Sequence, residues 1–426
     1  MAKKHDLILE KILEKVNPTK KEMEKMEFLL ENFKKKLNLK IDKLKIDAEV
    51  FVGGSFAKNT VVKKDIYDVD LFLRFNPKYK ETEFTKLTKK ILKGTKKVSV
   101  VHGSRDYFKV KVNSNFFFEI IPVKKVKNPR EADNITDLSY SHVKYIKKKI
   151  KSKKVLDGIK LAKAFCYATG TYGAESYVHG FSGYALELLV YYYGGFLEML
   201  KTLVKEKKDK IIVDIENEYK KKQNVLLDLN SSKLESPIIL IDPTFKGRNA
   251  LAALSYETFE IFRKKAREFL DKPKEKIFEL KELDLEKVKK RALQEKKEFL
   301  ILQTKTTRQE GDIAGTKLLK FHRHMIFEIG KYFEISETGF RYLGNKIGES
   351  YFVLKKKEFI LFCGPPVDSR KNVLKFKEEH SKTFVEEGRV CAKEKIIFDS
   401  KGFFKFWERK NKRKIKQMYV SRFKAI

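Results

Sequence analysis

The pattern of apolar and polar positions predicts helices at the start of the chain. Between residues 5 and 16, apolar side chains recur every three to four positions, which is the spacing of one helix face. Asn17-Pro18 interrupts this pattern, and Thr19 can cap a second helix that extends to about residue 37. The chain is therefore expected to begin with two amphipathic helices.

Short apolar or alternating segments then predict a sheet. Residues 48–52 and 68–75 are predicted strands, with a glycine pair directly after the first. Three more β-like segments follow a helical stretch, and Pro122 is expected to end the last because it has no backbone donor. These segments are 98–101, 107–112 and 116–121. The pattern predicts a mixed α/β unit built on one sheet.

The middle of the chain is predicted to be mostly helical. Long periodic segments cover 158–168 and 182–200, and Gly194-Gly195 interrupts the second. Pro273 and the Lys/Glu-rich stretch up to about residue 297 indicate a boundary followed by an exposed helix.

The last part predicts a small α+β module. A helix at about 315–333 lies between the first two of four predicted strands, and this strand–helix–strand–strand–helix order suggests a small RRM-like sheet. The strands are 298–304, 340–344, 350–355 and 358–363. The fold class is therefore α+β multidomain, with predicted domains 1–136, 137–272 and 273–426.

The basic C-terminal segment, residues 405–424, contains interspersed aromatic residues and allows two interpretations. Its charges and rings could bind RNA by neutralising phosphates and stacking on bases. The same rings could instead close a hydrophobic core.

Composition favours a polyanionic partner. Among 426 residues there are 95 Lys+Arg and 58 Asp+Glu, a formal net charge of +37. A lysine-biased proteome is the alternative, although such a bias usually raises glutamate as well. The three cysteines are far apart and show no disulfide or metal-ligand spacing, and no apolar run approaches the length of a membrane span. We expect a cytoplasmic protein with no membrane partner.

Residues 53–60 have the composition of a phosphate-binding turn. Gly53 and Gly54 allow positive φ and close approach of the backbone to a ligand. Ser55 adds a hydroxyl group, Lys58 adds a cation, and amides at the start of a following helix can bind phosphate. Two glycines alone are weak evidence, because any tight turn uses them.

Carboxylates downstream of this turn suggest metal-assisted phosphoryl chemistry. Asp68 and Asp70 lie on one face of a predicted strand, and Glu119 is a lone acid in an apolar run. Carboxylates that converge on one point can hold two Mg²⁺ ions. Asp68 and Asp70 alone could belong to a solvated strand edge, but the upstream turn and Glu119 favour the metal site.

The segment Gly54-Ser55-Phe56-Ala57-Lys58-Asn59-Thr60, followed by Asp-Val-Asp-Leu-Phe-Leu at 68–73, resembles the signature of the DNA polymerase β-type nucleotidyltransferase superfamily. A longer resemblance is to the archaeal (class I) CCA-adding enzymes, which are tRNA nucleotidyltransferases. Their further motifs are matched in order at 171–175 with 180–184, 241–243 with 248–250, and 364–366 with 370–373. The resemblance spans about residues 5 to 395 and implies a catalytic head, a helical neck, and a C-terminal body and tail.

The resemblance implies roles for individual residues. Metal binding and catalysis fall to Asp68, Asp70 and Glu119, and nucleotide binding falls to Gly54, Ser55, Lys58, His142, Lys163, Tyr172 and Arg248. Two positions depart from the family. Lys58 stands where arginine is common and loses the bidentate fork, and Glu119 stands where the family usually has aspartate.

Ordinary structural roles remain open for several of these residues. His142 could lie on a helix surface, Tyr172 could pack at a helix end, and Arg248-Asn249 could cap a helix. Lys163 is one lysine among many. Gly180–Gly183 is expected to allow close helix packing and not to bind phosphate.

The resemblance implies template-independent addition or repair of the 3′-terminal CCA of tRNA, with CTP and ATP as substrates, two Mg²⁺ ions and release of pyrophosphate. The tRNA acceptor end is the implied partner, and whether the chain forms a homodimer stays open. A poly(A) polymerase-like terminal transferase and a non-catalytic RNA-binding relative are the alternatives.

Overall fold

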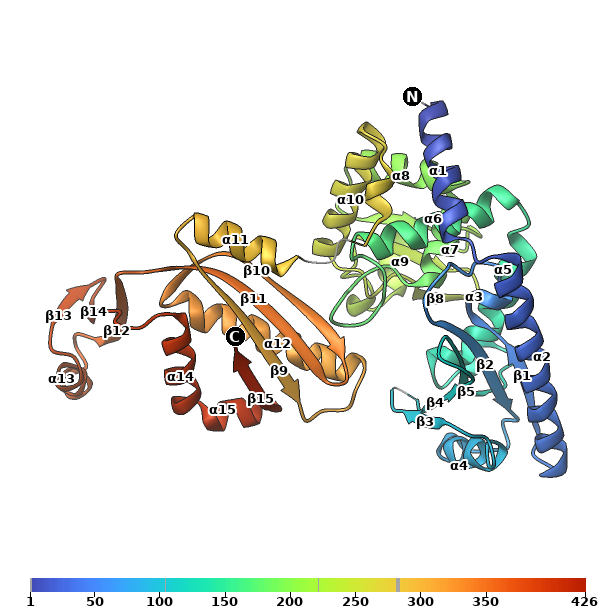
Figure 1. The fold of residues 1–426 in the computed structure, drawn as a ribbon, viewed down its shortest axis with the longest axis horizontal. Helices are drawn as coiled ribbons and strands as arrows, with labels where there is room; N and C mark the ends of the chain where they lie inside the picture. The colour runs from blue at the N-terminus through green and yellow to red at the C-terminus, as the bar shows by residue number, and fades with distance from the viewer. Residues whose placement is uncertain (1, 104, 221, 281–283) are drawn as a thin grey trace. The chain divides into compact units, whose positions relative to one another are not determined.

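The chain divides between residues 281 and 282 into two units, each with its own hydrophobic core. The computed structural model describes residues 2–103, 105–220, 222–280 and 284–426 (Figure 1). Within these residues, no helix combines the length and the apolar character needed to cross a membrane.

Two helices open the first unit. α1 (Ala2–Val16) and α2 (Lys20–Lys43) are separated by a short break, as the sequence predicted. Thr19 caps α2: its hydroxyl accepts a hydrogen bond from the Glu22 amide at 3.2 Å, and the Glu22 carboxylate accepts one from the Thr19 amide at 2.7 Å. α2 continues past the predicted end near residue 37 because Leu37 and Ile41 are buried in the core.

A five-stranded mixed sheet follows, in the order β1-β2-β5-β4-β3. β2 and β5 pair in parallel, and the other neighbours pair antiparallel. α2 and α4 (Glu81–Ile91) cover one face, and this core confirms the predicted single-sheet α/β unit. The strands are β1 (Ala48–Val52), β2 (Tyr67–Phe75), β3 (Val98–Val101), β4 (Tyr107–Lys111) and β5 (Phe116–Lys124).

The prediction that Pro122 ends the last of these strands is wrong. β5 runs on to Lys124, and Pro122 is paired with Leu73 of β2. The ladder between β4 and β5 stops at Ile120, so β5 has no strand partner on that side at Pro122. A proline at this position therefore removes no ladder hydrogen bond.

The remainder of the first unit is largely helical. α1 packs with these helices: its Leu9 and Ile12 belong to their core, and so do the helix-like residues 275–278 after α10. The helices are α5 (Ser139–Lys149), α6 (Lys153–Ala168), α7 (Gly183–Tyr192), α8 (Phe196–Lys205), α9 (Lys222–Asp228) and α10 (Tyr256–Asp271). Among the described residues of this part there are also four 3₁₀ turns: Pro129–Glu131, Ile135–Leu138, Ser231–Lys233 and Glu275–Phe278.

This part also contains a small sheet that the sequence did not predict. It has the order β6-β7-β8, with β6 (Ile211–Val213), β7 (Ile238–Asp242) and β8 (Phe245–Asn249). Every residue of β7 is buried, and the first four, Ile238–Ile241, form an apolar run without alternation before Asp242. Such a run cannot be distinguished from a buried helix by its periodicity.

The second unit contains two sheets. The larger has the order β10-β11-β9-β15, with α12 (Asp312–Gly330) packed on it and α11 (Leu285–Gln294) against β9 and β11. Its strands are β9 (Glu298–Thr306), β10 (Phe333–Gly344), β11 (Ile347–Lys356) and β15 (Val420–Ala425). The predicted strand at 358–363 lies in the smaller sheet, which comprises β12 (Phe359–Pro366), β14 (Arg389–Lys395) and β13 (Thr383–Glu386). α13 (Arg370–Glu379), α14 (Ser400–Lys410) and α15 (Lys412–Gln417) complete the unit.

Aromatic residues of the C-terminal segment contribute to the core of the second unit. Trp407 is 3% exposed, and its indole nitrogen donates to Glu328 Oε2 at 3.2 Å. Phe423 packs against Phe321 and Trp407. The interpretation in which these rings close a core is therefore confirmed for Trp407 and Phe423.

The capping box of α2 gives a first testable prediction. Replacing Thr19 by alanine removes the hydroxyl acceptor, so Thr19→Ala should lower the free energy of unfolding by about 1 kcal/mol. Thr19→Ser keeps the acceptor and should lose little. Urea unfolding followed by circular dichroism measures both, and equal stability of the alanine and serine variants would contradict the assignment of the cap.

Candidate active site

The glycine turn after β1 brings the backbone against Asp70. Gly53 donates its amide to the Asp70 carbonyl at 2.9 Å, and Gly54 has φ +60 at the start of the short helix α3 (Gly54–Ala57). A Cβ at Gly54 would lie 1.8 Å from Asp70 Oδ2, and one at Gly53 would lie 2.1 Å from the Phe72 ring. Glycine at position 54 is therefore favoured by both the positive φ and the close approach, and a side chain at position 53 would displace the Phe72 ring.

The three predicted carboxylates lie on one face of the sheet. Asp70 is the register partner of Glu119, and Asp68 lies two residues before Asp70 on the same strand. Burial raises the pKa of Asp70 to about 7, and the charges of Glu119 and Asp68 add to this effect. Carboxylate oxygens are the ligands that hard divalent cations prefer, so this donor set fits such an ion chemically.

Lysines pair with two of these carboxylates. Lys64 lies 3.5 Å from Asp68, and Lys109 lies 3.1 Å from Glu119. In the described part of the chain, no three His, Cys, Asp or Glu side chains come together closely enough to hold a metal ion. Asp68, Asp70 and Glu119 thus share a face without converging on one point.

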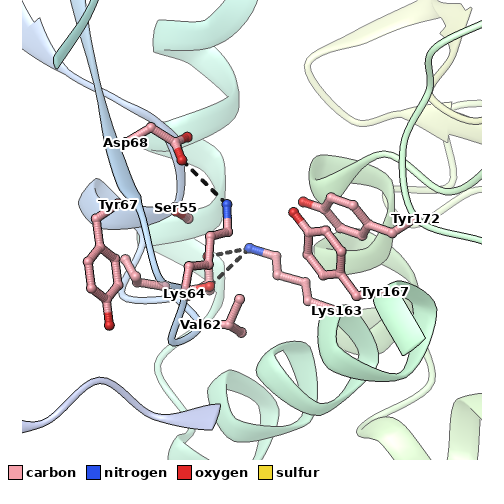
Figure 2. A pocket seen from close by; sticks show the side chains of 10 residues that line it. Ser55, Val62, Lys64, Tyr67, Asp68, Lys163, Tyr167 and Tyr172 are labelled. Carbon is pink, nitrogen blue, oxygen red and sulfur yellow. Dashed lines mark hydrogen bonds and ion pairs between the residues drawn. The ribbon is translucent and has the colours of Figure 1, made fainter. Parts of the chain in front are cut away.

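A small polar pocket beside Asp68 collects several of the other predicted residues (Figure 2). Ser55, Lys163 and Tyr172 line it, so the structure brings together residues from α3, from α6 and from the loop that follows α6. Figure 2 shows Lys64 extending toward Asp68, with Lys163 and the rings of Tyr167 and Tyr172 beside it. The two tyrosine rings stack with centroids 4.1 Å apart. The pocket therefore offers cations, a hydroxyl and a stacked aromatic pair.

Lys58 and Lys163 meet at a buried carboxylate. Lys58 Nζ lies 2.6 Å from Glu187 Oε2, and Lys163 Nζ lies 3.0 Å from Glu187 Oε1. Glu187 is fully buried on α7. Burial alone would raise the pKa of its carboxyl, but the charges of Lys163 and Lys58 outweigh burial and lower the pKa to about 2. Glu187 is therefore ionised at neutral pH.

His142 and Arg248 gather around a second buried carboxylate. Asp242 of β7 accepts hydrogen bonds from His142 Nε2 at 3.0 Å and from Arg248 Nη1 at 2.5 Å. Tyr184 donates its hydroxyl to the same carboxylate at 3.0 Å, and its ring stacks on His142 with centroids 4.0 Å apart. Burial alone would raise the pKa of Asp242, but its hydrogen bond with His142 and the charges of His142 and Arg248 hold it below its ordinary value.

The structure shows the local roles of Arg248-Asn249 and of Gly180–Gly183. Arg248-Asn249 does not cap a helix, because both residues end β8 and Ser255 caps α10. Gly180 and Gly183 allow close packing against the loop at 171–173, whereas the sequence predicted packing between helices. A Cβ at Gly180 would lie 2.2 Å from the Thr171 carbonyl oxygen, and one at Gly183 would lie 2.8 Å from the Tyr172 hydroxyl.

Sequence reasoning missed several residues of these clusters. Glu187 is a lone acid in the apolar run Leu186–Val190, the same signal that identified Glu119. Asp242 lies inside a recognised motif, but it was given no role. Tyr184 likewise lies inside the matched segment 180–184 without an assigned role, whereas Lys64 and Tyr167 lie outside the matched motifs and carry no comparable signal.

Two family models match the first unit. A model described as a nucleotidyltransferase domain matches residues 30–157, and one described as the second domain of tRNA nucleotidyltransferase matches residues 157–279. The two matches meet at residue 157, within α6 of the helical part.

Relatives extend the likeness into the second unit. The CCA-adding enzyme of Nanoarchaeum equitans is 33% identical over 355 residues, which cover 80% of this chain and 82% of that protein. The chain belongs to the family of CCA-adding enzymes. The CCA-adding enzyme of Methanocaldococcus jannaschii is 27% identical over 90% of this chain and 86% of its own length. That of Pyrococcus abyssi is 32% identical over 64% of this chain and 61% of its own length.

Solved structures show the same fold in other enzymes. The Cid1 poly(U) polymerase has a TM-score of 0.51 at 14% identity, and the match covers 66% of this chain and 100% of that chain. A cytoplasmic RNA terminal U-transferase has a TM-score of 0.50 at 13% identity with the same coverage. The expected fold class of this CCA-adding enzyme family member is thereby confirmed, and as the family implies, it uses nucleotide substrates and a divalent metal.

The close approach at Gly54 predicts that a side chain at this position weakens nucleotide binding. Gly54→Ala adds a methyl group against Asp70, so we expect the affinity for CTP, measured by calorimetry, to fall at least about tenfold. Gly94→Ala is the matched control, because Gly94 has a similar φ of +85 with nothing within 4 Å of its Cβ position. It should lose stability but keep CTP affinity. Equal CTP affinities for the two variants would contradict the proximity argument.

The ionised Glu187 predicts an acid-dependent loss of stability. Its pKa is 4.5 in the unfolded reference and about 2 in the folded chain, so its contribution is present above pH 4.5 and is lost as the pH falls toward 2. Across this window, the free energy of unfolding should fall more for the parent protein than for Glu187→Gln, by on the order of 3 kcal/mol. Urea titrations at stepped pH measure the difference, and parallel pH curves would disprove it.

Proposed function

We propose that this protein adds or repairs the 3′-terminal CCA of tRNA without a nucleic-acid template, from CTP and ATP and with release of pyrophosphate. The observation that carries the proposal is the carboxylate-bearing face of β2 and β5 beside the Gly53-Gly54 turn, in a chain of this family. A turn built from glycines lets the backbone come close to a triphosphate. Carboxylates beside the turn suit the divalent cations that accompany the triphosphate.

Asp68, Asp70 and Glu119 are the residues that would hold two Mg²⁺ ions. When bound, such ions activate an attacking hydroxyl group and neutralise the leaving pyrophosphate. Glu119 pairs with Asp70 in the β2–β5 ladder, which fixes its backbone position. Its side chain is one methylene longer than the aspartate that is usual in the family, so its carboxylate lies farther from the backbone. No protein nucleophile is required for this transfer.

The chain's own residues bind and orient the nucleotide. Ser55 and Lys58 follow the glycine turn and would hold the triphosphate. Lys163 and Tyr172 line the adjoining pocket, where Lys163 would act on the triphosphate through its charge and Tyr172 would contact the ribose. His142 and Arg248, fixed by Asp242, supply a ring and a guanidinium group for the incoming nucleotide. Their rigid placement supports selection of the base by geometry.

The tRNA acceptor end is the proposed macromolecular substrate. A formal net charge of +37 favours contact with the phosphates of an RNA helix. A-form RNA is bound mainly through its shape and backbone, which suits a substrate defined by its fold and not by its sequence. Cytoplasmic activity is the corresponding proposal for location.

A stepwise assay tests the function. The protein is incubated with tRNA that lacks its last three nucleotides, and CTP and ATP are supplied separately and together. Two additions with CTP alone, and a third that requires ATP and then stops, are expected. Unlimited addition of A would instead support a poly(A) polymerase-like enzyme, and no addition would support an RNA-binding relative.

Removal of one carboxylate should abolish nucleotidyl transfer and leave tRNA binding intact. Asp70→Asn is expected to eliminate incorporation of CMP and AMP, by at least about a thousandfold, while tRNA binding survives, because Asp70 lies at the reaction site. Asp65→Asn removes an exposed acid from the preceding loop and should keep incorporation. Radiolabelled nucleotides measure the first property and a gel-shift assay the second. Retained turnover in Asp70→Asn would overturn the metal assignment.

A further inference from the structure

Glu187 is a buried carboxylate to which the proposed chemistry gives no task. It is 0% exposed on α7, within an otherwise apolar helix face. An ionised acid is costly to bury without partners. Its partners come from distant parts of the chain: Thr60 donates to Glu187 Oε1 at 2.8 Å, and the two lysines bind as described above.

The two lysines differ in how many of their N–H donors remain available to a ligand. The Lys163 ammonium has three donors, and it uses them on the Thr60 carbonyl at 3.1 Å, the Thr60 hydroxyl at 2.8 Å and Glu187 at 3.0 Å. In the described residues, Lys58 Nζ makes a single hydrogen bond, to Glu187. Two donors of Lys58 therefore remain for a ligand, whereas Lys163 has none.

The charge balance favours an anionic ligand. Lys58 and Lys163 carry two positive charges against the single negative charge of Glu187, and all three side chains are at most 9% exposed. Within this group of three side chains there is one more positive charge than negative, and Lys58 also lies near the carboxylate of Asp70, where its charge partly offsets the rise in pKa caused by burial. A polyphosphate has the multiple negative charge and the acceptor oxygens to pair with the excess positive charge.

We propose that Glu187 is a positioning residue for the triphosphate: it holds the ammonium of Lys58 at the glycine turn, and Thr60 and Lys163 hold its carboxylate in turn. A free lysine side chain has several rotatable bonds, and fixing it costs conformational entropy. Glu187 fixes Lys58 before the ligand arrives, so polyphosphate binding does not bear that cost. The inference rests on the proposed nucleotide site but not on which RNA is extended.

The test measures binding of inorganic pyrophosphate, with Mg²⁺ present, by calorimetry without tRNA. Glu187→Gln keeps the shape of the side chain and removes its charge, and it should weaken pyrophosphate affinity about tenfold, as expected for loss of one charge-assisted contact. The KM for CTP and ATP should rise in parallel. Glu198→Gln, at an exposed position of α8 where the carboxylate pairs with Lys201, is the control and should bind as the parent protein does.

A double-variant cycle separates positioning from a general structural role. If Glu187 acts through Lys58, the K58M/E187Q variant should bind pyrophosphate as K58M does, because the mediator is already gone. A further tenfold loss in the K58M background would overturn the proposal. Unchanged or tighter binding by E187Q would also overturn it, because Glu187 would then be neutral or would compete with the ligand for Lys58.

If E187Q gives no cooperative melting transition, E187D takes its place: it keeps the charge with a shorter reach, and its loss of affinity should likewise vanish in the K58M background. If the parent protein binds pyrophosphate but does not extend tRNA, the proposed function fails while the Glu187 cycle still gives its own answer.

Discussion

The parallel pairing of β2 with β5 is the constraint on which the candidate site depends. It sets Asp70 opposite Glu119, while Val69, Leu71, Phe118 and Ile120 face the helices on the other side. A slip of one residue would turn every side chain of a strand to the opposite face, placing acids in the core and apolar residues in the site. Packing of the buried face therefore fixes the register of the reactive face.

Two buried carboxylates organise the polar residues around that face. Glu187 holds Lys58 and Lys163, and Asp242 holds His142 and Arg248. Each carboxylate gathers groups from separate segments, and together they account for four of the residues matched to nucleotide contacts. Arranging such groups by a shared counter-ion fixes them more firmly than separate surface contacts would.

Local signals were sufficient for most of the first unit. The helices up to Val16 and from Lys20, the strand before the glycine turn and the strand that carries Asp68 and Asp70 follow from periodicity and capping alone. The β6-β7-β8 sheet could not be predicted, because a fully buried strand shows no alternation. The role of Pro122 depended on where the neighbouring strand stops, and two of the partners of Glu187, Lys58 and Thr60, are more than a hundred residues away in sequence.

The packing of α1 determines how the sheet-bearing part is attached. α1 precedes α2 and the five-stranded sheet in sequence, yet its Leu9 and Ile12 belong to the core of the helices that follow the sheet. The chain thus leaves the helical part after α1 and returns to it at α5, so α2 and the sheet form an insertion within the helical part. An insertion is anchored through two chain crossings instead of one. The hydrogen bonds of Lys58 and Thr60 with Glu187 join the same two parts away from these crossings, so the sheet-bearing part is held at more than its two ends.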